Sequence, residues 1–184
     1  LSMGDGEDLT ALAAKRKRIL MVGHILQYHP AVVKLKELVA AGELGKIEYI
    51  YSNRLNMGMV RTEENIWWSF APHDVSVILS ILGEDPARIH AFGSDIIRKG
   101  VYDTTLVDLE FPSGVKAHIF VSWLHPFKEQ KLVVVGSRSM AVRRSSTDRS
   151  CSLLMEPNSR TTTTALPIIS VTMSSGTPKS RAIS

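Results

Sequence analysis

The segment DTTLVDLEFPSGVKAHIFVSW, residues 103–123, has the pattern of two β-strands joined by a tight turn. Apolar and polar residues alternate through residues 103–111 and again through residues 115–123, which is the period of a strand with one buried face. The Pro-Ser-Gly sequence at residues 112–114 lies between them and favours a hairpin turn. The segment therefore predicts an antiparallel pair of strands.

More strands are predicted on both sides of this hairpin. Residues 87–94 precede it, residues 131–135 follow it, and residues 139–142 are expected to pair back across Gly136. Residues 46–56 alternate and are rich in Tyr and Ile, which predicts a further strand earlier in the chain.

Two helices are predicted before most of these strands. One spans residues 31–41, with Pro30 in its first turn and Gly42 as its stop. The other begins near Pro72, after a loop at residues 57–67. Helices followed by an antiparallel meander predict the α+β class, with an open, mainly antiparallel sheet and helices on one face.

The beginning of the chain indicates a different architecture. Residues 1–16 have helical spacing, and residues 19–23 form a short continuous apolar run. Such a run is typical of a strand that is buried on both faces of a parallel sheet. A helix that leads into such a strand is half of an α/β unit, so we expect the other half to lie outside this chain.

Composition divides the chain near residue 140. Residues 137–184 hold seven Lys and Arg against two Asp and Glu, contain no aromatic residue and are rich in Ser and Thr. Residues 143–184 have neither helical nor strand periodicity and are expected to be disordered. Because this part lacks aromatic residues for base stacking and any nucleic-acid-binding motif, we expect no nucleic-acid partner.

The residue types exclude several other classes of protein and site. The single cysteine, Cys151, excludes a disulfide framework and a cysteine-based zinc site, and the histidines show no ligand spacing, so no metal is expected. No apolar stretch is long enough for a membrane helix, and no secretory signal is visible. We therefore expect no membrane partner and a cytoplasmic location.

Three segments of the chain resemble one family of enzymes. GHILQYHPAVVKLKELVAAGELGKIEYIYSNRLN (residues 23–56), EENIWWSFAPHDVSVILSILGEDP (residues 63–86) and FVSWLHPFKEQKLVVVG (residues 120–136) are similar to the Gfo/Idh/MocA family of nicotinamide-dependent sugar dehydrogenases. Within it, they are most similar to the 3-dehydrogenases of UDP-N-acetylglucosamine and its uronic acid. The resemblance covers residues 5–142 and occurs in family order.

The resemblance implies a domain division. Residues 1–24 would be the last helix and strand of an N-terminal Rossmann domain, and residues 25–142 the C-terminal domain for substrate binding and oligomerisation. Residues 143–184 would be a Ser/Thr/Arg-rich tail outside the family pattern, and translation from a shifted reading frame is one hypothesis for it.

Two motifs that bind the cofactor and assist catalysis are not matched. The Met-Gly-Asp-Gly sequence at residues 3–6 does not fit the context of the glycine-rich turn that cradles a pyrophosphate. The lysine of the family's Glu-Lys-Pro segment would lie upstream of Leu1. The implied cofactor is NAD, with NADP as the alternative, and most of its binding site is expected outside this chain.

Six residues are candidates for the site. The resemblance places His73 beside the sugar hydroxyl, where it would act as the catalytic base. Tyr28 is the candidate for contact with the cofactor or the sugar. The candidates for substrate contact are Arg54, Asn56, Trp68 and Ser69.

A neutral His73 would suit this role. If Pro72 is the first helical residue, His73 lies in the first helical turn, where the positive end of the helix dipole favours the neutral, proton-accepting ring. Asp74 points in another direction, and a carboxylate at this position is expected to stabilise the helix start.

Structural alternatives stay open for the other candidates. Arg54 suits a diphosphate or a uronate carboxylate, but a surface salt bridge explains it equally well. Trp68 offers a flat face to a ring, although adjacent tryptophans more often serve packing. Tyr28 fits a domain junction as well as a ligand contact. Ser69 stands where many family members have an aspartate, and it could cap the helix or touch the substrate.

The function expected from this resemblance is NAD-dependent oxidation of a secondary hydroxyl of a nucleotide sugar. We expect a fragment of such an enzyme, inactive alone and assembled as a homo-oligomer through its open sheet. The alternative is a non-catalytic oligomerisation module built on the same sheet, because an uncovered apolar face needs a partner.

Overall fold

The computed structural model describes residues 3–58, 60–61, 63–145, 151–157 and 170–173. The helices are α1 (Met3–Lys15), the short 3₁₀ helix η1 (Ile25–Tyr28), α2 (Pro30–Ala40) and α3 (Ile66–Leu82). The strands are β1 (Ile47–Met57), β2 (Arg88–Ser94), β3 (Thr104–Glu110), β4 (Lys116–Ser122), β5 (Leu124–Gly136), β6 (Ser139–Ser145), β7 (Cys151–Pro157) and β8 (Ser170–Met173).

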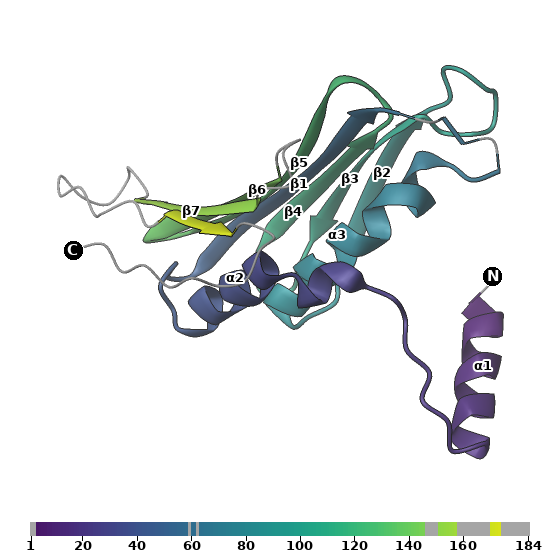
Figure 1. Cartoon of the computed structure of the whole chain (residues 1–184), viewed down its shortest axis with the longest axis horizontal. Coiled ribbons are helices and arrows are strands. Elements are labelled where there is room, and N and C mark those ends of the chain that lie inside the picture. The colour runs from purple at the N-terminus through teal and green to yellow at the C-terminus, as the bar shows by residue number, and fades with distance from the viewer. Residues whose placement is uncertain (1–2, 59, 62, 146–150, 158–169, 174–184) are drawn as a thin grey trace.

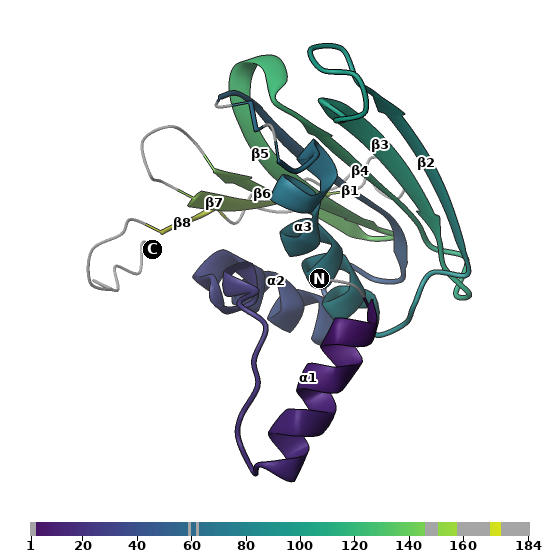
Figure 2. The same cartoon turned by 90° about the vertical axis from the view of Figure 1, so that its right-hand side faces the viewer.

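The described strands form one open sheet in the order β2-β3-β4-β1-β5-β6-β7-β8. All neighbouring strands are antiparallel except β1 and β4, which are parallel. Helices α2 and α3 cover one face of this sheet and leave the other face without a helix (Figures 1 and 2). The prediction of an α+β fold with a mainly antiparallel sheet and helices on one face is confirmed.

The predicted hairpin is formed by β3 and β4. Phe111 N–H donates to the carbonyl of Val115, and Gly114 N–H donates back to the carbonyl of Phe111, both at 2.9 Å. Gly114 has a φ of +87°, a backbone conformation that favours glycine. The predicted pairing across Gly136 is also confirmed, because β5 and β6 pair through Val135 and Met140.

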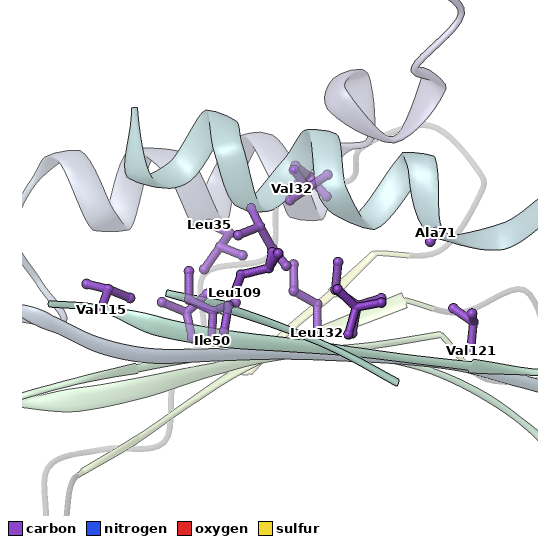
Figure 3. Packing of buried hydrophobic residues seen from close by; sticks show 14 of the residues in the cluster. Val32, Leu35, Ile50, Ala71, Leu109, Val115, Val121 and Leu132 are labelled. Atoms are coloured by element: carbon purple, nitrogen blue, oxygen red, sulfur yellow. The ribbon is translucent and has the colours of Figure 1, made fainter. Parts of the chain in front are cut away.

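The hydrophobic core lies between the two helices and the sheet. Helix α2 contributes Val32 and Leu35, and Ile50, Val121 and Leu132 project from the sheet towards the helices, all essentially inaccessible to solvent (Figure 3). Burying side chains of this size contributes roughly 1.5–3 kcal/mol each. This layer therefore fixes the position of α3 over the sheet.

Helix α3 begins earlier than the sequence pattern predicts. It starts at Ile66 and not near Pro72, because the Asn65 side chain accepts a hydrogen bond from the Trp68 N–H and caps the first turn. Pro72 is tolerated inside the helix although it cannot donate the usual hydrogen bond to the carbonyl of Trp68. The predicted loop at residues 57–67 is correspondingly shorter.

The start of the chain differs from the predicted α/β half-unit. Helix α1 is present, but none of its residues is buried, and it stands apart from the two-layer body (Figure 1). The predicted strand at residues 19–23 is wrong: this segment is not a strand, and Ile19 is 98% exposed. No strand among the described residues pairs with it, so its apolar side chains have no face to pack against.

The prediction of a disordered tail from residue 143 is wrong for three described segments. Strand β6 continues to Ser145, and β7 and β8 extend the sheet. Alternation in residues 139–145 continues the strand past the point where the family resemblance stops. The remaining residues of the predicted tail, 146–150, 158–169 and 174–184, lie outside the described part of the chain.

We expect Gly136→Ala to destabilise the fold by about 1–3 kcal/mol, because overpacking forces the neighbouring backbone to shift. A Cβ atom at this position would lie 2.1 Å from the backbone oxygen of Leu44. Gly23→Ala is the matched control, since nothing lies within 4 Å of its added methyl group. Urea unfolding of both variants measures the difference, and equal midpoints would contradict this packing.

Candidate functional site

A buried ion pair ties β1 to α3. The Nε of Arg54 donates to Oδ2 of Asp74 at 2.6 Å, and its Nη2 donates to Oδ1 at 3.0 Å. The two side chains are only 12% and 5% exposed. The surface salt bridge considered for Arg54 is therefore a buried bidentate pair, and two of the guanidinium donors point at Asp74. Asp74 stabilises the helix–sheet contact and not the helix start.

His73 precedes Asp74 on α3 and is half-buried. Its Nδ1 is buried and has no hydrogen-bond partner among the described residues. The ring of His24, from the segment before η1, lies edge-on to it with 6.3 Å between ring centroids. His73 therefore neighbours Asp74 along the helix and lies edge-on to His24.

Burial lowers the pKa of His73 below its ordinary value of 6.5. The positive charge of Arg54 lowers this pKa further, the Asp74 carboxylate opposes it, and the neighbouring His24 adds a smaller lowering effect. The lowered pKa favours the neutral ring, which is the form that the sequence analysis expected. The expected cause is wrong, however, because His73 lies in the interior of α3 and not in its first turn.

Ser69 lies one helical turn before His73 and on the same side of α3. Its hydroxyl donates to Oε1 of Glu64 at 2.8 Å, so it does not cap the helix, a role that Asn65 fills. Glu64 also pairs with Arg61. A carboxylate thus lies beside Ser69, and the sequence analysis missed it because it placed Glu64 in a loop far from the helix start.

The adjacent tryptophans face different surroundings. Trp68 is 66% exposed and borders a hollow of about 630 Å³ that also contains two acidic residues. We call it the acidic hollow, lined by Glu63, Glu64, Asn65, Trp68, Gly100 and Val101. Trp67 packs against the hydrophobic core instead. Trp67 therefore packs partly against the core, whereas the exposed ring of Trp68 borders the acidic hollow.

Among the described residues, no hydrogen bond or ion pair joins Tyr28 to His73, His24 or Asp74. Tyr28 ends η1, is 70% exposed, and its hydroxyl donates to the sulfur of Met21 at 3.9 Å. Asn56, near the end of β1, is half-buried. The described contacts join Arg54 to Asp74 and His73 to His24, and His73 and Asp74 are neighbours on α3.

The described residues do not fit a dinucleotide site. The Met-Gly-Asp-Gly sequence at residues 3–6 lies inside α1, so it is not a turn between a strand and a helix. No strand, glycine turn and helix follow one another in the way that a pyrophosphate cradle requires, as far as the described part of the chain extends. Among the same residues, no three His, Cys, Asp or Glu side chains are grouped so that they could hold a metal ion. No described helix is long and apolar enough to cross a membrane.

Comparisons with known proteins identify the domain. The family model of the GFO/IDH/MocA C-terminal domain matches residues 32–142. The chain is 28% identical over 148 residues to the uncharacterized oxidoreductase YrbE of Bacillus subtilis (strain 168), an alignment that covers 73% of this chain and 43% of that protein.

Two solved structures have the same fold. UDP-N-acetylglucosamine 3-dehydrogenase GnnA from Acidithiobacillus ferrooxidans superposes with a TM-score of 0.75 and 20% identity, over 92% of this chain and 53% of that one. An inositol dehydrogenase homolog from Azotobacter vinelandii, complexed with NADH and myo-inositol, superposes with a TM-score of 0.79 and 16% identity, over 92% of this chain and 46% of that one. The chain spans about half the length of these relatives.

We expect NMR titration to place the pKa of His73 below 6.5. Because the unfolded chain then binds a proton that the folded chain does not, the free energy of unfolding should fall as the pH drops from 6.5 towards the folded pKa. His73→Gln should reduce this loss, although the lowered pKa values of His29 and His118 leave part of it. A His73 signal that titrates above 6.5 would contradict the described surroundings.

Proposed function

This chain belongs to the GFO/IDH/MocA family, and from that premise we propose that it forms the sugar-facing part of a dehydrogenase. The proposed reaction is the oxidation of a secondary hydroxyl of a nucleotide sugar, with NAD or NADP as the hydride acceptor. The acceptor is assigned from the family and its relatives, because the described residues do not form its site. Activity, substrate and cofactor are thus proposals about the protein as a whole.

The observation that carries the proposal is the surroundings of His73, whose Nδ1 is buried without a hydrogen-bond partner among the described residues and whose pKa burial lowers. When a secondary alcohol becomes a carbonyl, a hydride leaves the carbon and a proton leaves the oxygen. A neutral imidazole accepts that proton at pH 7, whereas an imidazolium could not. Burial and the charge of Arg54 keep the ring neutral, and the carboxylate of Asp74 favours the protonated ring once the proton has moved.

The acidic hollow supports a sugar as the substrate. An exposed indole such as that of Trp68 offers a flat apolar face, and carboxylates such as Glu63 and Glu64 accept hydrogen bonds from hydroxyl groups. Ser69 links this hollow to His73, because it bonds to Glu64 and lies one turn away from the imidazole. The nucleotide part of the proposal draws on the name of the A. ferrooxidans relative.

The uncovered sheet face supports a second role, as an oligomerisation surface. Phe92, Leu106 and Phe120 lie opposite one another in the register of β2, β3 and β4, and they alternate with residues that face the helices. Phe92 is 65% exposed and Leu106 is 38% exposed. A row of apolar side chains on an open face fits the same face of a second copy.

The nucleotide-sugar proposal is tested by titrating the 184-residue chain with UDP-N-acetylglucosamine and following its histidine NMR signals. We expect the His73 ring signal to shift, because the reacting hydroxyl binds there, and the signal of the exposed His90 on β2 to stay in place. His73→Gln should weaken binding about three- to tenfold, the loss of one hydrogen bond. Mixed with NAD, the same chain should form no NADH. A stationary His73 signal at saturation would contradict the proposal.

The oligomerisation proposal is tested by size-exclusion chromatography with light scattering. The chain should run as a dimer or tetramer, and Leu106→Lys should yield monomers because it places a charge in the apolar row. Val33→Lys is the matched control, since Val33 is similarly exposed but lies on α2, away from this face. A monomeric parent chain would refute the proposal.

A further inference from the structure

A second hollow lies between the first turn of α3 and strands β2 and β3. Its volume is about 420 Å³, within the range of small-molecule pockets, and its lining is mainly apolar and aromatic. We call it the aromatic hollow, and the residues that matter to it are Asn65, Trp67, Gly93, Tyr102 and Thr105. None of them has a role in the proton transfer proposed above.

Thr105 supplies an unsatisfied polar group at this hollow. The residue is 8% exposed, and its Oγ1 is buried without a hydrogen-bond partner among the described residues. Buried hydroxyl groups in folded proteins are nearly always hydrogen-bonded, because an unpaired one destabilises the fold. Because this oxygen is shielded in the free chain, a turn of the side chain about χ1 would bring it to the hollow, where a polar atom of a bound ligand would satisfy it.

Gly93 keeps the hollow open. It lies opposite Thr105 in the register of β2 and β3. A Cβ atom on Gly93 would lie 2.9 Å from Cδ1 of Tyr102 and 3.2 Å from Cγ2 of Thr105. Any larger residue would therefore displace the Tyr102 ring, so the present shape of the hollow depends on a glycine here.

The hollow combines the groups that recognise a planar heterocycle. Trp67 and Tyr102 offer aromatic faces for stacking, and Thr105 offers a hydroxyl that both donates and accepts. Asn65 adds a side-chain amide whose oxygen already accepts from the Trp68 N–H. An aliphatic chain would leave the Thr105 hydroxyl unpaired, whereas a nitrogen heterocycle with carbonyl groups would not.

The two hollows adjoin at the first turn of α3. Asn65 lines both, while Trp67 borders the aromatic hollow and Trp68 the acidic hollow. The acidic hollow suits sugar hydroxyls, and exposed Lys99 precedes Gly100 on its rim, where a cation suits a diphosphate. A molecule with a base at one end and a sugar at the other would match both hollows.

We propose that the aromatic hollow binds the nucleobase of the nucleotide sugar, with its ring between Trp67 and Tyr102 and a carbonyl or ring nitrogen bonded to Thr105. This inference rests on the proposed function and makes it more specific, because it assigns a part of this chain to the nucleotide. It separates a nucleotide-sugar enzyme from one that acts on a free sugar or polyol.

The test is an NMR and calorimetric titration of the full chain with uridine 5′-monophosphate. We expect the indole N–H signal of Trp67 and the amide signal of Thr105 to shift. Thr105→Val keeps the shape of the side chain but removes the hydroxyl, and it should weaken binding about three- to tenfold. Its melting temperature should stay the same or rise, because the hydroxyl has no hydrogen-bond partner among the described residues of the free protein.

Two further variants make the result decisive. Thr104→Val is the matched control: the neighbouring residue points to the other face of β3, so binding should change less than about twofold. Gly93→Ala should weaken binding by displacing Tyr102, and it tests the hollow independently if Thr105→Val fails to fold. Equal affinities in Thr105→Val and Thr104→Val, with Gly93→Ala unaffected, would overturn the assignment.

The ligand series distinguishes this inference from the proposed function. Methyl N-acetylglucosaminide is the second probe, and it should shift the signals of Trp68 and His73 but not those of Trp67 and Thr105. If this glycoside binds and uridine monophosphate does not, the nucleobase site is refuted while a sugar-binding lobe stands. If neither binds, both proposals fail. Binding of NAD at Thr105 without binding of uridine monophosphate would refute the assignment to the substrate.

Discussion

The bidentate pair between Arg54 and Asp74 is the contact on which the arrangement of the site depends. It joins the central strand β1 to α3, and both of its side chains are buried. Loss of either partner would leave the other charge buried without compensation and would strongly destabilise the fold. His73 is the adjacent residue on the helix, so the pair sets where the imidazole lies as well as the charge around it. The same two side chains therefore stabilise the helix–sheet contact and influence the pKa of His73.

The early start of α3 has an equally large effect on the site. Because Asn65 caps the helix, Trp67, Trp68 and Ser69 lie on successive helical positions and point in different directions. One ring packs towards the core, one borders the acidic hollow, and the serine bonds to Glu64. A loop in this region could not hold these three side chains in such distinct surroundings.

Much of the sheet could be predicted from the sequence, because alternation and turn residues are local signals. The lowered pKa of His73 comes from burial and not from the helical position that the sequence analysis used. The helix start could not be predicted, since Pro72 is a typical first-turn residue and the competing cap at Asn65 is a single side chain. The partners of Arg54 and Ser69 could not be predicted either. The partner of Arg54 depends on which faces of β1 and α3 meet, which no local spacing encodes, and the partner of Ser69 depends on where α3 begins.

The parallel pairing of β1 with β4 has a consequence for synthesis on the ribosome. Ile50, at the centre of the sheet, lies beside Ala117 on one side and Val134 on the other. The central strand therefore leaves the exit tunnel long before either neighbour exists, and loop closure over such separations is slow. Until β5 emerges, β1 keeps an unpaired edge, and an exposed strand edge makes a nascent chain prone to aggregation.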